Sequence, residues 1–179
     1  MTTKGSSTSG VKLYVMDTSV SPHVAIPVDQ LKGATMVGGG QRKKIDISNF
    51  DSAAYDELQG GRAAPPELTG ELVLDLTNTN HQALKKLFEA QAAGTAANSA
   101  CYAGFADASS PPTVVAGVLT PPETASPKKW ARSGIQGNGY CSNITPKAAD
   151  NDVWRGDFKW QYSGKATWTV KGQAISLSY

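Results

Sequence analysis

Charged residues are scarce in this chain of 179 residues, since Asp, Glu, Lys and Arg together make up 18% of it, against roughly 25% in typical globular proteins. The formal net charge is only +2, which is too small to indicate a general binder of nucleic acids or membranes. Long apolar runs are also missing, because none approaches the roughly 18 residues that span a bilayer. The first ten residues are polar and small, so we expect neither a signal peptide nor a membrane anchor there.

Residues that commonly bind metals or act as nucleophiles are few. His23 and His81 have no second histidine four residues away, and Cys101 and Cys141 do not form a C-x-x-C pair. A zinc site or a helical metal site is therefore not expected. We interpret the cysteines as two buried thiols, although a disulfide between neighbouring strands stays open. His81 lies near the first turn of a predicted helix, where we expect a solvent-exposed side chain.

Two short motifs match functional signatures, but the surrounding sequence that each signature requires is missing. Residues 126–129 spell S-x-x-K, but no K-T-G follows in the chain, and the penicillin-binding use of this motif needs one. Residues 38–44 join glycines to cations, but a strand pattern follows instead of the helix that a phosphate loop requires, so we predict a hairpin turn. We predict no catalytic residue, no cofactor-binding residue and no metal ligand, and we expect that the chain is not an enzyme.

Turn-forming residues are abundant by comparison. Eighteen glycines and ten prolines exceed the usual share of these two residues, about 12%, and this argues against a helical bundle. The length suits one domain with a sizeable core. We predict a flexible arm at residues 1–10 and one domain over residues 11–179.

Charge is distributed unevenly along the chain. Residues 128–179 contain eight Lys or Arg against three Asp, whereas residues 1–127 contain nine against twelve Asp or Glu. Two interpretations stay open. The asymmetry either provides complementary faces for self-assembly or arises by chance.

The front half shows alternating apolar residues that are typical of strands. We predict strands at residues 11–15 and 44–47, and a return strand at residues 23–28, where Pro27 favours a sheet edge or a bulge. Residues 49–68 form the longest irregular stretch of this half, with Phe50, Tyr55 and Leu58 among polar residues. A connector of this length is uncommon in a compact domain, so we interpret it as a loop that becomes covered in an assembly, with a short helix as the alternative.

A strand followed by a helix is predicted in the middle of the chain. Leu72, Leu74 and Leu76 alternate with polar residues, which indicates a strand with these leucines inward. Asn78, Thr79 and Asn80 are candidate N-caps for a helix. Its apolar stripe contains Leu84, Leu87 and Phe88, its outward side carries Lys85 and Lys86, and Gly94 ends it.

The region after the helix is rich in alanine and then in proline. Residues 101–105 are compatible with a strand, and residues 114–119 with another. The rest of the Pro-rich stretch, residues 109–128, is expected to be an exposed excursion.

The C-terminal region has the clearest alternation in the chain. Trp154, Phe158, Trp160 and Tyr162 alternate with polar residues, and beyond Ser163 and Gly164 the alternation continues with Ala166, Trp168 and Val170. This pattern predicts a hairpin with a two-residue turn and one aromatic face buried in the core. An exposed aromatic platform for sugars or bases is the alternative.

Several segments in a fixed order carry a family resemblance. They are residues 44–52, 55–61, 68–72, 79–84, 139–146 and 152–164. In this order they resemble the major tail tube protein of siphovirus-type phages, whose tails are long and non-contractile. Residues 109–128 have no counterpart in this resemblance.

The resemblance implies both a fold and a function. The implied fold is mainly β, with two packed antiparallel sheets in a sandwich-like or barrel-like arrangement and one flanking α-helix. The implied function is structural: homo-hexameric rings stack head-to-tail into the tail tube of the virion, through which genome DNA passes without specific binding. Implied partners are other copies of the chain and the tape-measure, tail terminator and baseplate or tip proteins, with assembly in the host cytoplasm and no membrane.

Two hypotheses about surfaces follow from the resemblance and the residues. Residues 49–68 are the predicted inter-ring stacking loop, with Phe50, Tyr55, Leu58 and Arg62 as candidate interface residues. The face that lines the channel is predicted to be neutral or acidic, because clustered Lys and Arg would hold passing DNA. The alternatives are a tube protein like that of type VI secretion systems, and a carbohydrate-binding β-sandwich that uses Trp154, Trp160 or Trp168.

Overall fold

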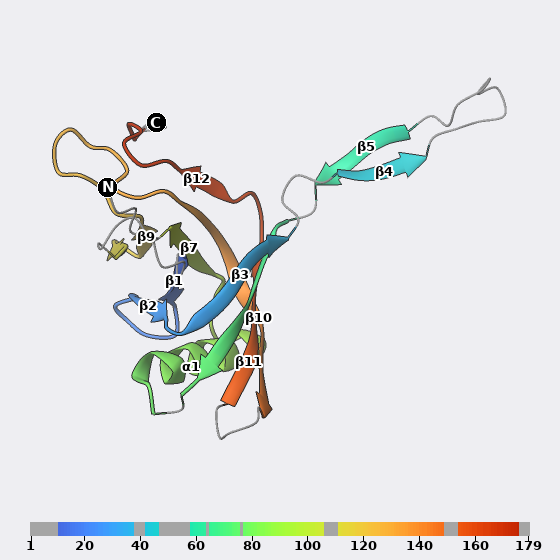
Figure 1. The fold of residues 1–179 in the computed structure, drawn as a ribbon, viewed down its shortest axis with the longest axis vertical. Coiled ribbons are helices and arrows are strands. Elements are labelled where there is room, and N and C mark those ends of the chain that lie inside the picture. The colour runs from blue at the N-terminus through green and yellow to red at the C-terminus, as the bar shows by residue number, and fades with distance from the viewer. Residues whose placement is uncertain are drawn as a thin grey trace, which may run out of the picture.

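The computed structural model describes residues 11–37, 42–46, 58–63, 65–75, 77–105, 111–148 and 154–175. Its main sheet has eight strands, of which seven follow the order β2-β1-β7-β10-β11-β6-β3 while β12 pairs with β10 (Figure 1). Every pairing in this sheet is antiparallel. The strands are β1 (Val11–Asp17), β2 (Val24–Val28), β3 (Leu31–Val37), β6 (Glu67–Leu74), β7 (Ser99–Phe105), β10 (Gly134–Ala148), β11 (Trp154–Tyr162) and β12 (Thr167–Thr169).

The main sheet curls until its two ends come together. β2 and β3 stand at opposite ends of the strand order, but only Asp29 and Gln30 separate them in sequence. Gln30 has a left-handed φ of 55°, and its carbonyl accepts a hydrogen bond from the Val73 N–H at 3.3 Å. The two halves of the sheet therefore face each other as the layers of a sandwich, which confirms the predicted mainly-β fold with one helix.

One apolar core fills the space between the two layers. Its side chains come from β1, β2 and β7 in one layer, from β6, β10 and β11 in the other, and from α1 (Thr79–Ala92). Each fully buried large apolar side chain contributes roughly 1.5–3 kcal/mol. The buried members are Leu13, Val15, Val28, Leu68, Leu72, Leu84, Leu87, Cys101, Ala103, Cys141, Phe158, Trp160 and Tyr162.

The helix α1 matches its prediction closely. The side chain of Asn78 accepts hydrogen bonds from the N–H groups of Asn80 and His81, so Asn78 is the N-cap. Leu84 and Leu87 are buried. The helix ends before Gly94, whose φ of +71° is a conformation that glycine adopts without strain. Lys85 and Lys86 are exposed, as predicted.

The first two strands pair as expected, whereas β3 and the strand Leu58–Ala63 were not predicted. β1 pairs with β2, and Pro27 lies opposite Tyr14 on this end strand of the sheet. A second, two-stranded sheet is formed by β4 (Arg42–Asp46) and β5 (Leu58–Ala63), and it projects away from the body (Figure 1). Residues 49–68 are therefore not an irregular connector throughout, because β5 and the start of β6 lie within them. The proposed arm at residues 1–10, the glycines at 38–40 and Leu76 lie outside the described residues.

The Pro-rich stretch corrects a prediction. Where one strand was expected at residues 114–119, β8 (Thr113–Val115) and β9 (Val118–Thr120) form a hairpin, with a turn at Ala116 and Gly117 where φ is 50° and 78°. Its flanks are exposed only in part, because Pro112, Pro121 and Pro122 are buried whereas residues 124–128 are exposed as predicted. The physical reason is a second apolar cluster, in which Tyr14, Met16, Tyr102 and Leu119 are buried together, so that the hairpin covers the outer side of β1 and β7.

The C-terminal hairpin is a second correction. β12 does not pair with β11. Both strands pair with β10, one after the other, in the same direction. Tyr162 lies opposite Gly139 and Thr167 opposite Gln136, so four residues span the space of two on β10. The Ser163 N–H bonds to the Asn138 carbonyl at 2.9 Å, which keeps the chain against β10 instead of reversing it.

Candidate assembly surfaces

A broad polar face covers the side of β3, β6, β10 and β11 that points away from the core. Leu68, Leu72, Phe158 and Trp160 point inward, and strand alternation places their neighbours on the opposite side. Cross-strand register aligns these neighbours into rows. The outward polar residues are Lys32, Thr35, Glu67, Thr69, Glu71, Asn143, Thr145, Arg155, Asp157, Lys159 and Gln161.

The charges on this polar face nearly balance. Its described side chains include three cations, Lys32, Arg155 and Lys159, and three carboxylates, Glu67, Glu71 and Asp157, and the register places a further cation, Lys147, opposite Arg155. Arg155 Nη1 lies 2.9 Å from Glu71 Oε1, and Lys159 Nζ lies 3.7 Å from Glu67 Oε1. Such exposed pairs add little to stability. Their effect is to keep the net charge of a wide hydrophilic surface small.

The β4–β5 sheet carries two of the four predicted interface residues. Leu58 and Arg62 lie on β5, and Leu58 is opposite Asp46 on β4. Phe50 and Tyr55 lie outside the described residues, so the grouping of the four at one interface stays a prediction. The β4–β5 sheet extends beyond the main sheet, so a neighbouring molecule could reach it (Figure 1).

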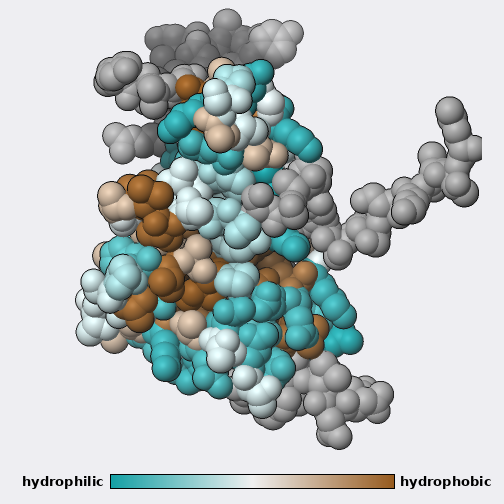
Figure 2. All heavy atoms as spheres, turned by 90° about the vertical axis from the view of Figure 1, so that its left-hand side faces the viewer, coloured by the Kyte–Doolittle hydropathy of each residue, from teal (hydrophilic) through white to brown (hydrophobic). Residues whose placement is uncertain are grey.

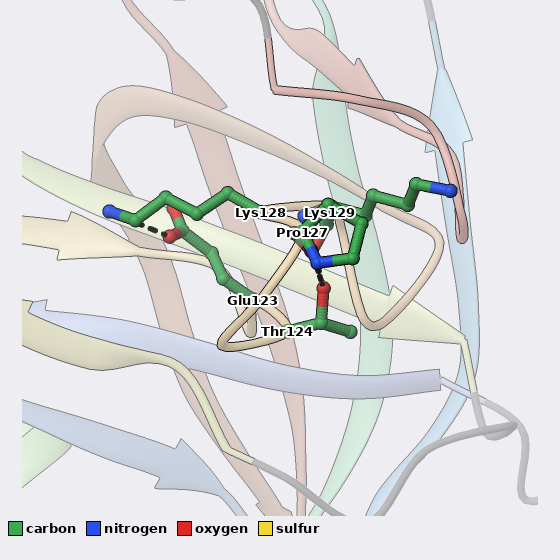
Figure 3. Close-up of polar contacts among 5 residues, drawn as sticks. All are labelled: Glu123, Thr124, Pro127, Lys128 and Lys129. Carbon is green, nitrogen blue, oxygen red and sulfur yellow. Dashed lines mark hydrogen bonds and ion pairs between the residues drawn. The ribbon is translucent and has the colours of Figure 1, made fainter.

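A basic loop is held in a defined shape at residues 123–130. The Thr124 hydroxyl donates to the Pro127 carbonyl at 2.6 Å and accepts from the Lys129 N–H at 3.1 Å. Lys128 Nζ lies 3.8 Å from a carboxylate oxygen of Glu123. The side chains of Lys128 and Lys129 extend in opposite directions from the loop (Figure 3). The S-x-x-K letters thus lie in a bend and not at the start of a helix.

The structure buries a charged residue that the sequence pattern did not reveal. Arg132 is fully buried, and its Nη2 donates to the Gly104 carbonyl at 3.0 Å. A Cβ on Gly104 would lie 2.7 Å from Arg132 Nε and 2.8 Å from the Tyr102 ring. Glycine at this position therefore lets the guanidinium and the ring both pack against the strand. The nearby glycines at 104 and 134 were the only sequence signal for this close packing.

His81 is buried, which contradicts the predicted exposure. Its Nδ1 accepts from the Asp75 N–H at 3.0 Å, and its Nε2 faces the Asp29 carbonyl at 3.1 Å. A ring nitrogen that faces a carbonyl donates, so Nε2 bonds to the Asp29 carbonyl as a donor, whereas Nδ1 lies near both the N–H and, at 3.2 Å, the carbonyl of Asp75. The ring thereby connects the β2–β3 turn to the segment before α1. Asp29 is 52 residues away in the chain, so the local position of His81 on the helix could not indicate this partner.

Other titratable groups are perturbed for simple reasons. The Thr77 hydroxyl and N–H both bond to the Asp75 carboxylate and lower the pKa of Asp75. Burial raises the pKa of Cys101 and raises that of Cys141 to about 12. Burial also raises the pKa of Tyr162, whose hydroxyl lies 3.9 Å from Cys101 Sγ. Both cysteines are free and buried, so these thiols are protonated and unreactive near neutral pH.

The tryptophans of the predicted aromatic face divide into different environments. Trp160 is fully buried, whereas 62% of Trp168 is exposed, which contradicts the expectation that both are core residues. The side chain of Trp154 lies outside the described part of the structure. Across the described residues, no group of three His, Cys, Asp or Glu side chains is placed to hold a metal ion. The same residues include no helix long and apolar enough to cross a bilayer.

Comparison with known proteins identifies the family. The sequence profile described as phage tail tube, TTP, lambda-like matches residues 4–172. The chain belongs to this family of phage tail tube proteins. It is therefore a structural protein of the virion tail. No curated protein matches the sequence.

Solved structures show the same fold at low sequence identity. The tail of an empty GTA (gene transfer agent) particle with C6 symmetry aligns with a TM-score of 0.56 and 12% identity, covering 89% of this chain and 96% of that one. The SPP1 tail tube aligns with a TM-score of 0.55 and 11% identity, covering 95% and 81%. The anti-feeding prophage baseplate aligns with a TM-score of 0.52 and 7% identity, covering 94% and 97%.

Proposed function

We propose that this tail tube protein assembles into hexameric rings that stack head-to-tail, and that the polar face of β3, β6, β11 and β10 lines the channel. The observation that carries this proposal is the small net charge of that face, with three cations against three carboxylates among its described side chains and one further cation, Lys147, placed there by register. DNA is densely charged, and each uncompensated cation would hold it and slow its passage. A wide hydrophilic wall with little net charge lets DNA slide. The six-fold symmetry of the gene transfer agent tail supports the ring number.

The finer assignments of the proposal concern partners and place. Genome DNA passes through the lumen without specific binding. The ends of the tube meet tape-measure, tail terminator and baseplate or tip proteins. Assembly occurs in the host cytoplasm, and the chain catalyses no reaction. Edge strands of a lone sandwich attract unwanted pairing, and a closed ring of copies would cover them.

The channel assignment can be tested by labelling in the assembled tube. Lys32 lies on the polar face and Lys86 on the exposed side of α1, so Lys32→Cys and Lys86→Cys are matched variants. Each is biotinylated with a maleimide before assembly. The native thiols are buried and do not compete. We expect streptavidin to bind tubes of Lys86→Cys and to be excluded from tubes of Lys32→Cys. Equal binding to both would contradict the channel assignment.

We also propose that residues 49–68, with Phe50, Tyr55, Leu58 and Arg62, provide the contact between stacked rings. Support comes from the projection of the β4–β5 sheet beyond the body (Figure 1). Because Asp46 pairs with Leu58, replacement of residues 47–57 by Asn-Gly would close a short hairpin without disturbing the strands. Electron microscopy should then show rings without long tubes. Tubes of normal length would refute the stacking role.

A further inference from the structure

An exposed apolar patch lies on one flank of the molecule. It consists of Val20, Val24, Val115 and Val118, whose exposed fractions lie between 43% and 62%. The first two belong to β2 and the turn before it, and the last two to the β8–β9 hairpin. A Cβ on Gly117 would lie 3.8 Å from the His23 ring, so the two pieces touch. Figure 2 shows apolar side chains gathered on this side of the molecule.

A groove adjoins this valine patch. Its floor and walls come from the outer side of β1 and β2 and from the residues before β8. Tyr14, Ala25, Pro27, Pro112 and Val114 give it apolar walls. β2 also pairs only with β1 among the described strands. Lys12 and Asp29 also line the groove, so its walls are apolar only in part, and the valine patch supplies the exposed apolar area beside it.

A second apolar feature stands at the opposite edge of the same part of the sheet. Trp168 on β12 is 62% exposed, and Val170 is 52% exposed. Residues 134–136 of β10 pair with β7 on one side and with β12 on the other. The local strand order is therefore β2-β1-β7-β10-β12, which puts the two edges about 19 Å apart at the usual strand spacing.

Trp168 and the β8–β9 part of the valine patch lie on opposite faces of the sheet. Trp168 is opposite Ile135, which is opposite Ala103, a residue of the inner core. The β8–β9 hairpin, with Val115 and Val118, instead covers the outer side of β1 and β7. Val24 differs, since it pairs with Asp17 at the end of β2 and shares the face of the core residues. The two apolar features are therefore different surfaces at opposite edges of the sheet.

We propose that Trp168 and Val170 of one copy pack on the valine patch and its groove in the next copy. This inference rests on the proposed ring assembly and names its lateral contact. Two different surfaces at opposite edges form a heterologous contact, and repetition of such a contact closes into a ring when the rotation fits. We assign the groove and the valine patch to a second copy because the chain itself carries both apolar surfaces of the contact. Exposed tryptophans in apolar pockets are typical interface anchors.

A cysteine pair tests the contact directly. The variant Val170→Cys with Val115→Cys, which keeps Trp168 and Val118, is oxidised at assembly concentration and analysed without reducing agent. We expect a ladder of covalently linked copies that ends at the closed ring. The matched control is Val170→Cys with Lys86→Cys, which should remain largely monomeric. Equal cross-linking of the two variants, or none in assembled tubes, would overturn the contact.

Single substitutions provide the second readout. Trp168→Ala and Val118→Asp should raise the protein concentration needed for assembly roughly 30-fold or more, as expected for an interface anchor, while Trp168→Phe should retain most assembly. Circular dichroism should show the unassembled variants folded, because both side chains are exposed.

If the parent chain forms tubes and Trp168→Ala forms them equally well, this contact is wrong and the proposed function stands. If the parent chain forms no tubes, the proposed function fails. Retention of the parent chain on a polysaccharide column that Trp168→Ala loses would identify a sugar as the occupant and refute the contact.

Discussion

β11 and β12 follow each other along one edge of β10 with the same apolar alternation, but their burial differs. On β11, Phe158, Trp160 and Tyr162 are almost completely buried. Beyond it, Ala166 still packs against the core, whereas Trp168 is mostly exposed. Both sets point to the same side of the sheet. Alternation thus decides toward which face of the sheet a side chain points, and the presence of a second layer decides whether that side chain is buried.

The second layer ends between the two strands. β11 pairs with β6 along its length, and α1 places Leu84 and Leu87 in the same core as Trp160. β12 pairs only with β10 among the described strands. The β11 region is therefore a closed interior, whereas the same face of the β12 region is left uncovered in the single chain. Four predictions test this contrast.

The largest expected effect comes from truncating the two tryptophans. Trp160→Ala should lower the free energy of unfolding by about 3–5 kcal/mol, because it leaves a large cavity in a closed core. Trp168→Ala should change it by less than about 0.5 kcal/mol in the unassembled protein. Urea unfolding followed by circular dichroism measures both. Similar losses for the two variants would show that the β12 region is already closed in the monomer.

The second prediction concerns the hydrogen bonds of His81, which connect the start of α1 to the β2–β3 turn. His81→Ala should cost roughly 1–3 kcal/mol, because the Asp29 carbonyl and the Asp75 N–H lose their partner in a buried place. His23→Ala is the control, since His23 bonds only to a carbonyl three residues away. Thermal unfolding measures the loss of stability in both variants. A loss for His81→Ala as small as that for the control would mean that the ring does not hold the helix in place.

The third prediction uses pH to probe the closed interior. The pKa of Cys141 is raised from 9.0 to about 12 by burial, so its contribution to stability is complete below pH 9 and is lost as pH rises toward 12. At pH 10 the wild type should lose roughly 1 kcal/mol through this thiol. Urea midpoints at pH 8 and pH 10 should therefore differ less for Cys141→Ala than for the wild type. An identical difference would show that the thiol is accessible to water.

The smallest effect is expected on the polar side of β11 itself. Arg155→Ala removes an exposed ion pair with Glu71 and should cost about 0.2–1 kcal/mol. The same loss should be smaller at high salt, because exposed charges are screened. A double-mutant cycle with Glu71→Ala isolates the pair energy. A coupling well above this range would indicate that the polar face is less solvated than its exposure implies.

The sequence by itself determined much of the local structure. The alternation of Leu72 and Leu74 and the spacing of Leu84 and Leu87 predicted a strand and a helix that the structure contains, and Asn78 and Gly94 marked the ends of the helix. The order of segments also indicated the tail tube family. These signals are local, since one strand face, one helix stripe or one cap is decided by residues a few positions apart.

Only the tertiary structure decided which faces are covered and which polar groups are satisfied. His81 is buried because the β2–β3 turn brings Asp29 to it from 52 residues away. The prolines at 112 and 121 are buried because β1 and β7 are apolar on both sides, and Trp168 is exposed because no second layer reaches β12. Burial is a property of two surfaces in contact, and a pattern along one strand describes only one of them.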